Sequence, residues 1–294
     1  MSGPRLRIFS DLHLDSNEGR APPAIFADVD FDILVVAGDV CEDPERAVGW
    51  LAAQNVWADK MIVYAPGNHD YYGCRLENAI GRTRRASLAT GGRVVVLDPG
   101  AVVIERDGWK ARFIGAPLWT DLQAPVGILN PAAIAAQGMS DYACIRIRRR
   151  DPWGTTISRL RDMAARLLDG GRLLRPQDTI GMHRAQIVMI ERETAEAFDG
   201  PTVVVTHHAP SMRSIAQERK KDLLTPAYAS VLDELLLRLP ERGVRLWIHG
   251  HVHHSVRYRC GVEVICNPVG YGVFKGKWEN PLFDPKLTVD LGVT

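Results

Sequence analysis

The sequence lacks any apolar run long enough to cross a membrane. No stretch approaches the roughly 18 consecutive apolar residues that a transmembrane helix requires. The opening stretch, Met1–Ser10, also lacks the apolar core of a secretory signal peptide. Cysteine is scarce as well. The sequence has five cysteines, which is an odd number, and no two of them form a Cys-x-x-Cys pair. A disulfide framework is therefore disfavoured, and we expect a cytoplasmic protein with free thiols.

The sequence also lacks an excess of positive or negative charge. Lys and Arg number 36 against 35 for Asp and Glu, which gives a net charge of +1. Such a balance creates no global field that would attract nucleic acid or an anionic membrane. The 294 residues are 46% hydrophobic and 24% charged, as in ordinary globular proteins. We expect no membrane partner, we do not favour nucleic acid, and the sequence leaves the oligomeric state open.

Short apolar runs alternate with helical patterns along the chain. The runs are continuous, which is typical of strands covered on both faces. They lie at Leu6–Ser10, Asp32–Ala37, Met61–Ala65, Thr202–Thr206 and Val244–Ile248. Helices are predicted at Pro44–Gln54, Arg75–Ala89, Thr155–Leu168, Gln177–Phe198 and Tyr228–Leu239. This alternation predicts an α/β fold.

Two hairpins and one irregular stretch complete the outline. Asp107-Gly108 and Gly261 each separate two short β-type runs, which is the pattern of a tight hairpin. Residues 116–153 have the weakest regular pattern, and long irregular segments in compact proteins often carry function. We predict a single domain over residues 1–294, with an insertion or lid at about 116–153.

Each of the five predicted strands runs into residues that bind metals. These motifs are Asp11-x-His13, Gly38-Asp39, Gly67-Asn68-His69-Asp70, His207-His208 and Gly250-His251-x-His253-His254. Taken singly, each motif has an ordinary explanation as a turn or a cap. Ligand sites in open α/β sheets lie beyond the carboxyl ends of the strands, however, so the five strand ends can converge. Together they predict one metal-binding crevice.

The donor set narrows the chemistry of this crevice. Imidazole, carboxylate and amide oxygen suit first-row ions such as Fe, Mn, Zn, Ni or Co. No cysteine joins the motifs, which argues against a structural zinc site. Seven good ligands are too many for one ion and enough for two, and pairs of ions serve phosphatases and nucleases. The sequence therefore predicts two divalent metal ions.

The ordered set D-x-H, G-D, G-N-H-D, strand-end H and G-H-x-H resembles the calcineurin-like metallophosphoesterase superfamily. The motifs span residues 11 to 253, nearly the whole chain. The resemblance implies a four-layer sandwich of two facing mixed β-sheets flanked by helices. It also implies a dinuclear, metal-dependent phosphoric ester hydrolase. Such an enzyme cleaves a phosphate mono- or diester of a small phosphorylated substrate with a hydroxide that bridges the metals.

The same resemblance implies a role for each residue of the motifs. One metal would be held by Asp11, His13 and His253, and the other by Asn68, His207 and His251, with Asp39 bridging them. His69 would be the catalytic histidine near the leaving group, and Asp70 would orient it. The strand-end ligand could be His207 or His208, and we favour His207 because it comes first off the strand.

The sequence departs from the protein Ser/Thr phosphatases of the superfamily. Their G-D-x-V-D-R-G motif supplies a phosphate-binding arginine, whereas Gly38-Asp39 is followed here by Val40-Cys41-Glu42-Asp43. The chain is more similar to small bacterial and phage-type members, through Met139-Ser140-Asp141-Tyr142 and Asn267–Tyr271.

Arg146, which follows the first of these two stretches, is our candidate for a substrate phosphate contact, since arginine matches phosphate bidentately. A nuclease or nucleotide phosphodiesterase of the same superfamily is the alternative function. An inactive scaffold is less favoured, because all seven ligand-type residues are present.

Overall fold

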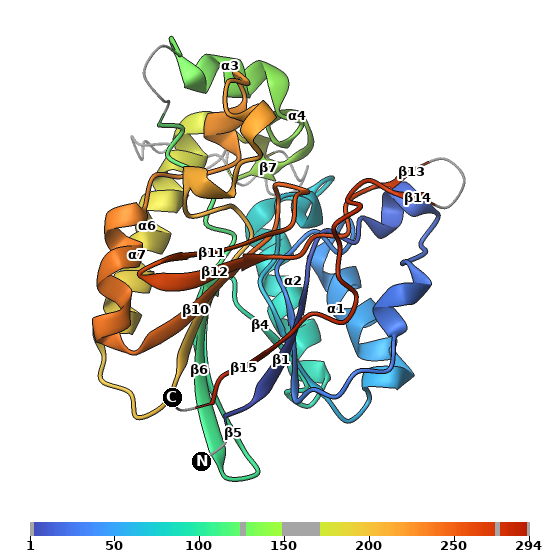
Figure 1. Cartoon of the computed structure of the whole chain (residues 1–294). Helices are drawn as coiled ribbons and strands as arrows, with labels where there is room; N and C mark the ends of the chain where they lie inside the picture. The colour runs from blue at the N-terminus through green and yellow to red at the C-terminus, as the bar shows by residue number, and fades with distance from the viewer. Residues whose placement is uncertain (1–2, 124–127, 149–170, 274–276, 293–294) are drawn as a thin grey trace, which may run out of the picture.

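The computed structural model describes residues 3–123, 128–148, 171–273 and 277–292. Two β-sheets face each other, with helices on their outer sides (Figure 1). The helices are α1 (Pro44–Ala53), α2 (Leu76–Ala89), α3 (Pro131–Gly138), α4 (Asp141–Cys144), α6 (Pro176–Ala195) and α7 (Asp233–Arg238). The predicted α/β fold with two facing mixed sheets is confirmed.

The first sheet has the strand order β15-β1-β2-β3-β4, in which β1 to β4 are parallel and β15 is antiparallel. Its strands are β1 (Arg5–Phe9), β2 (Ile33–Val36), β3 (Met61–Tyr64), β4 (Val94–Val96) and β15 (Thr288–Asp290). The C-terminal strand β15 thus pairs with the N-terminal strand, and the described ends of the chain lie close together (Figure 1).

The second sheet has the order β11-β12-β10-β9-β6-β5 and is mixed. Its strands are β5 (Gly100–Arg106), β6 (Trp109–Ala116), β9 (Thr202–Thr206), β10 (Val244–His249), β11 (Val256–Cys260) and β12 (Val262–Cys266). The hairpins β5–β6 and β11–β12 form as predicted around Asp107-Gly108 and Gly261. Two minor pairs are β7 (Arg146–Ile147) with β8 (Arg172–Leu173), and β13 (Gly272–Val273) with β14 (Lys277–Trp278).

Both faces of the central strands are buried, which explains their continuous apolar runs. In β2, Ile33 and Val35 pack between the two sheets, while Leu34 and Val36 pack on the outer side with α1. Strand β9 repeats the pattern, since its alternate valines face the inter-sheet core and the layer of α6 and α7. Successive side chains of a strand point to opposite faces of its sheet, so each of these strands contributes to two apolar layers.

One predicted helix is wrong at its start. Tyr228–Leu239 was expected to be helical, but α7 begins only at Asp233. The backbone just before Asp233 instead forms hydrogen bonds with another segment. The amides of Ser230 and Leu232 donate to the carbonyls of Ala209 and Pro210. A residue engaged in this way cannot also pair within a helix.

The stretch 116–153 is more regular than predicted. It contains α3 and α4, and α3 is capped by Asn130, whose side chain accepts from the amide of Ala133 at 3.2 Å. The predicted helix Thr155–Leu168 lies outside the described residues. Figure 1 places α3 and α4 at the end of the molecule opposite the chain termini.

The structure bears on two further features considered in the sequence, which are membrane-spanning helices and cysteine thiols. Within the described ranges, no helix combines the length and apolar character needed to span a bilayer. All five cysteines are free thiols, and four of them are buried.

Candidate metal centre

The strand ends carry an unusual backbone conformation. Positive φ angles, between 43° and 70°, occur at Asp11, His13, Asp39, His251 and His253. Such angles are uncommon for residues other than glycine and tend to gather at functional sites. Here they turn the chain sharply after β1, β2 and β10, so that side chains from both sheets point to one place.

Glycines let these turns approach one another. A Cβ atom at Gly250 would lie 2.6 Å from both the carbonyl oxygen of Ala37 and Oδ2 of Asp11, and one at Gly67 would collide with Asp39. Contacts this short leave no room for a side chain. The glycines that precede Asn68 and His251 are therefore required by the packing of the strand ends.

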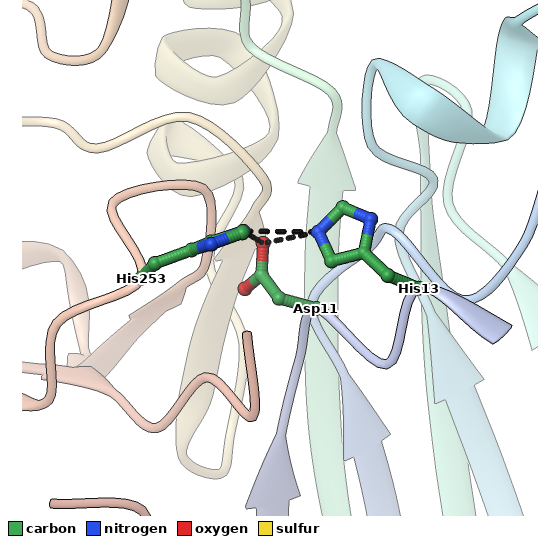
Figure 2. Close-up of side chains that lie close together, drawn as sticks. All are labelled: Asp11, His13 and His253. Carbon is green, nitrogen blue, oxygen red and sulfur yellow. Dashed lines mark hydrogen bonds and ion pairs between the residues drawn. The ribbon is translucent and has the colours of Figure 1, made fainter. Parts of the chain in front are cut away.

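The first group of ligand-type side chains is Asp11, His13 and His253 (Figure 2). The Nε2 atoms of the two histidines face each other at 2.9 Å, and Oδ1 of Asp11 lies 3.4 Å from Nε2 of His253 and 3.9 Å from Nε2 of His13. Donor atoms that share one ion at bond lengths of about 2.1 Å stand about 3 to 4 Å apart, depending on the angle at the ion. This spacing fits a divalent ion.

The second group is Asp39, His207 and His251, with Asn68 beside it. Oδ1 of Asn68 lies 3.0 Å from Nε2 of His207, which in turn is 3.2 Å from Oδ2 of Asp39. Two buried atoms here make no hydrogen bond: Nε2 of His251, and Oδ2 of Asp39, which has only its ion-pair contacts with His207 and His13. Buried polar atoms are normally paired, so these two fit ligands of a metal.

Asp39 joins the two groups. Its Oδ2 also lies 3.7 Å from Nε2 of His13, and a third overlapping group consists of His13, Asp39 and His69. The other carboxylate oxygen, Oδ1, accepts a hydrogen bond from the backbone amide of His69 at 2.9 Å. One oxygen is thus fixed by the backbone, and the other stays directed between the two groups. We call the seven residues Asp11, His13, Asp39, Asn68, His207, His251 and His253 the floor of the site.

The charges of the floor are coupled. Burial acts to raise the pKa of Asp39, but the adjacent His207 and His69 hold it well below its usual value. Burial acts to lower the pKa of His207, yet the Asp39 carboxylate raises it to about 9. Burial, together with the neighbouring histidines, lowers the pKa of His251 far below its usual value. A neutral imidazole of this kind is the form that coordinates metals.

In the first group, too, the pKa of one histidine is lowered and that of the other is raised. Burial lowers the pKa of His13 to about 4, whereas contacts with Asp11 and Glu279 overcome burial and raise the pKa of His253 to about 10. One of the two nitrogens at the 2.9 Å contact donates to the other. A cation between them would take the place of the donated proton.

Hydrogen bonds at Nδ1 orient two histidines of the floor. Nδ1 of His207 lies 2.8 Å from the carbonyl oxygen of Ala37, and Nδ1 of His253 lies 2.6 Å from Oε2 of Glu279. Each Nδ1 therefore donates, which leaves Nε2 for the floor. His208 points its Nδ1 to the carbonyl oxygen of Pro117 at 3.0 Å instead. Among the described residues the structure thus brings His207, and not His208, into a group of ligands.

His69 lies at the mouth of the floor between two tyrosines. Its ring stacks on Tyr72 with centroids 4.2 Å apart, and its Nε2 is 3.2 Å from the hydroxyl of Tyr271. Asp70, predicted to orient His69, has other partners. Its carboxylate accepts from the backbone amides of Asp39, Val40, Cys41 and Gly67 at 2.7 to 3.2 Å. Asp70 thus joins the loops after β2 and β3, and the tyrosines hold the His69 ring.

A cleft of about 200 Å³ opens over the floor. Beyond the ligands and His69, it is lined by Tyr72, Gly138, Met139, Ser140, Arg219, Tyr228, Tyr271 and Glu279. We call Gly138–Ser140, Arg219 and Tyr228 the wall. The segment 116–153 therefore does reach the cleft, through Gly138–Ser140.

The structure does not bring Arg146 to this cleft. Its guanidinium donates to the carbonyl oxygen of Gly171 at 2.7 Å, and its strand pairs with β8. The arginine that lines the cleft is Arg219, in a 3₁₀ turn, Gln217–Arg219. Sequence reasoning missed Arg219 and Glu279, since neither follows a predicted strand or belongs to a quoted motif. Tyr72 and Tyr271 could have been found, because Tyr72 follows Gly67–Asp70 closely and Tyr271 ends the quoted stretch Asn267–Tyr271.

Comparisons with known proteins agree with this geometry. A family model described as calcineurin-like phosphoesterase matches residues 4–255. The chain belongs to this family of metallophosphoesterases, a class of metal-dependent hydrolases. None of the curated proteins compared with the sequence matches it.

The chain also aligns with solved structures at low sequence identity, and the first of them shares its fold. The phosphopantetheinyl hydrolase of Mycobacterium tuberculosis aligns with a TM-score of 0.62 and 17% identity over 96% of this chain and 99% of that one. A putative 5'-nucleotidase from Staphylococcus aureus gives 0.39 and 12%, over 90% and 48% of the two chains. A dimetal phosphatase from Danio rerio gives 0.35 and 14%, over 80% and 71%.

Proposed function

We propose that the protein hydrolyses a phosphate mono- or diester with the help of two divalent metal ions. The observation that carries the proposal is the chain of three ligand groups, in which the third group shares His13 with the first and Asp39 with the second. Oδ2 of Asp39 and Nε2 of His251, both buried in these groups, have no hydrogen-bond partner. Asp11, His13 and His253 would hold one ion, Asn68, His207 and His251 the other, and Asp39 both.

Divalent ions in such a floor supply an activated water at neutral pH and stabilise charge on the phosphoryl group. The residues around them then have distinct tasks. His69, held between Tyr72 and Tyr271, donates a proton to the leaving oxygen, because imidazole exchanges protons readily near neutral pH. Its place beside the floor, with Nε2 toward the cleft-lining Tyr271, gives this proton a path to the substrate.

Arg219 is the proposed contact for the phosphate of the substrate. It is an exposed cation on the wall of a cleft whose floor is built to hold cations. A guanidinium matches two phosphate oxygens at once. Binding of the phosphate between the floor and Arg219 would place its ester oxygen near His69, which lines the same cleft.

Metal loading followed by a substrate screen tests the proposal. The chain is stripped of metal, reloaded with Mn, Fe or Zn, and analysed for bound ions per chain. The screen contains phosphomonoesters, cyclic nucleotides, dinucleotides and nucleic acids, and also a phosphopantetheinyl ester, because the neighbour of that name aligns over nearly its full length. We expect two ions and hydrolysis that depends on them. Protein that takes up no ion, or that is fully loaded yet cleaves none of these esters, would refute the proposal.

A further inference from the structure

Asn68 is the one amide among the proposed ligands, and its side chain can lie in two orientations. Its amide has an oxygen and an NH₂ group of nearly equal size, and a metal accepts only the oxygen. Something in the protein must therefore keep the NH₂ group turned away from the floor. The neighbours of the two ends of this side chain show what does so.

The NH₂ end of Asn68 faces Asp141. Nδ2 donates to Oδ1 of Asp141 at 2.7 Å, while Oδ1 of Asn68 lies on the floor, 3.0 Å from Nε2 of His207. A carboxylate accepts hydrogen bonds and offers no donor to an amide oxygen. A reversed amide would set oxygen against oxygen in a buried place, since Asn68 and Asp141 are 1% and 3% exposed. Asp141 therefore selects the orientation with the amide oxygen on the floor.

Asp141 belongs to the inserted part of the chain and not to the sheets. It is the first residue of α4 and directly follows Met139 and Ser140, which line the cleft. The same Oδ1 accepts from the hydroxyl of Tyr72 at 2.7 Å, and the Tyr72 ring stacks on His69. One carboxylate oxygen thus connects the wall with a proposed metal ligand and with the support of the proposed proton donor.

We propose that Asp141 is a positioning residue that holds the Asn68 amide for metal binding and links metal occupancy to the order of the wall. The inference rests on the proposed function. Its essential property is an acceptor oxygen at this place, so an asparagine at 141 can replace the carboxylate if its own amide oxygen faces Asn68 and Tyr72. Ala or Leu at 141 cannot.

The test is Mn²⁺ binding by calorimetry to the full chain and to three variants. Asp141→Ala should weaken one of the two binding steps by about 10- to 100-fold, the usual effect of losing a partner that orients a ligand. Asp141→Asn should stay close to wild type. Tyr72→Phe is the matched control, because it removes the other donor to the same oxygen and keeps the 2.7 Å hydrogen bond from Asn68 to Asp141. It also removes the longer contact of 3.5 Å between Nδ2 of Asn68 and the Tyr72 hydroxyl, so it measures what that contact adds.

Hydrogen exchange gives a second readout that a merely structural role would not move. Mn²⁺ should slow amide exchange in residues 139–145 of wild type and of Asp141→Asn, and leave it unchanged in Asp141→Ala. If Asp141→Ala does not fold, Asp141→Leu in the Tyr72→Phe background keeps the volume and leaves only the Asn68 amide without its acceptor.

The outcomes separate this inference from the proposed function. Wild type that binds two Mn²⁺ ions, with Asp141→Ala binding them equally tightly, overturns the role of Asp141 alone. Equal loss in Asp141→Asn and Asp141→Ala also overturns it, because a charge and not an acceptor would then be needed. Wild type that binds neither Mn²⁺ nor the Fe and Zn of the loading experiment refutes the proposed function, and the inference fails with it.

Discussion

The floor and the wall of the cleft are built in different ways. Floor residues follow buried strands directly, and their backbones are held by hydrogen bonds across both sheets, such as those from the amides of Gly250 to His207 and of Asp11 to Gly38. Wall residues come from the connections between β6 and α6 and between β9 and α7, and Ser140 and Arg219 are exposed.

Under the proposed function, this contrast separates reaction from recognition. The floor backbone is held by hydrogen bonds between neighbouring strand ends within each sheet, so it can change little without disturbing the sheets. The wall is attached to that frame by a separate apolar cluster, in which Tyr142 packs with Tyr72, and by the Asp141 hydrogen bonds to Asn68 and Tyr72. Binding specificity commonly varies in such connections while the scaffold that carries the chemistry stays constant. Changes in the floor should therefore affect metal and turnover, and changes in the wall should affect substrate binding.

The largest effect is expected from Asp39→Asn. The amide keeps an oxygen for the backbone of His69 but removes the charge shared by both ligand groups. We expect kcat/KM to fall by about 10³-fold or more, since metal ions contribute several kcal/mol to transition-state stabilisation. Bound Mn per chain should fall below two. If the variant keeps two ions and near wild-type turnover, the claim that floor residues determine metal content and turnover is wrong.

His69→Ala is the next test, and it probes the boundary between the two regions. Loss of a general acid should lower kcat by about 10²- to 10⁴-fold while metal content stays near wild type. The deficit should shrink for a nitrophenyl ester, whose leaving group needs little protonation. Because His69 also belongs to one ligand group, loss of metal in this variant would instead make it a ligand.

Arg219→Ala tests the wall itself. Loss of a charged hydrogen-bonding contact to phosphate costs about 1.5–3 kcal/mol, so kcat/KM should fall roughly 10- to 150-fold, mainly through KM. Metal content should not change. Arg146→Ala is the matched control, because this arginine contacts Gly171 and does not line the cleft. Equal losses in both variants would show that general positive charge, and not Arg219, attracts the substrate.

The floor residues could be predicted from the sequence because each one is identified by its neighbours along the chain. Each ligand lies within a few residues of the end of an apolar run, and parallel strands bring such ends together. The hairpins were equally local, since Asp107-Gly108 adopts the positive φ angles that tight turns demand.

The rest depends on contacts between distant segments. Nothing near Glu279 in the sequence shows that it meets His253, 26 residues away. The start of α7 was missed because the chain around Tyr228 pairs with Ala209, a long-range bond that overrides helical periodicity. Arg146 was chosen for charge and position in the insertion, yet the fold turns it toward Gly171 and brings Arg219 to the cleft instead. Local patterns do not encode such pairings.

The smallest expected effect concerns a buried carboxyl outside the floor. Asp98 follows β4, is 4% exposed and accepts a hydrogen bond from the hydroxyl of Tyr71. Burial raises its pKa from 3.8 to about 6. The folded chain therefore binds more protons than the unfolded chain between about pH 4 and pH 6, and this group makes the free energy of unfolding fall as pH rises through that window.

Asp98→Asn removes that dependence and keeps an oxygen for Tyr71. Relative to wild type, the variant should gain about 1–3 kcal/mol of stability between pH 4 and pH 6.5, as a shift of this size implies. Urea unfolding of both proteins in EDTA measures the difference without any contribution from metal. Floor carboxylates are common to both proteins and cancel in it. A difference that stays constant over this pH range would show that Asp98 does not titrate there, and that its burial resembles that of the floor carboxylate Asp39, whose neighbours hold it charged.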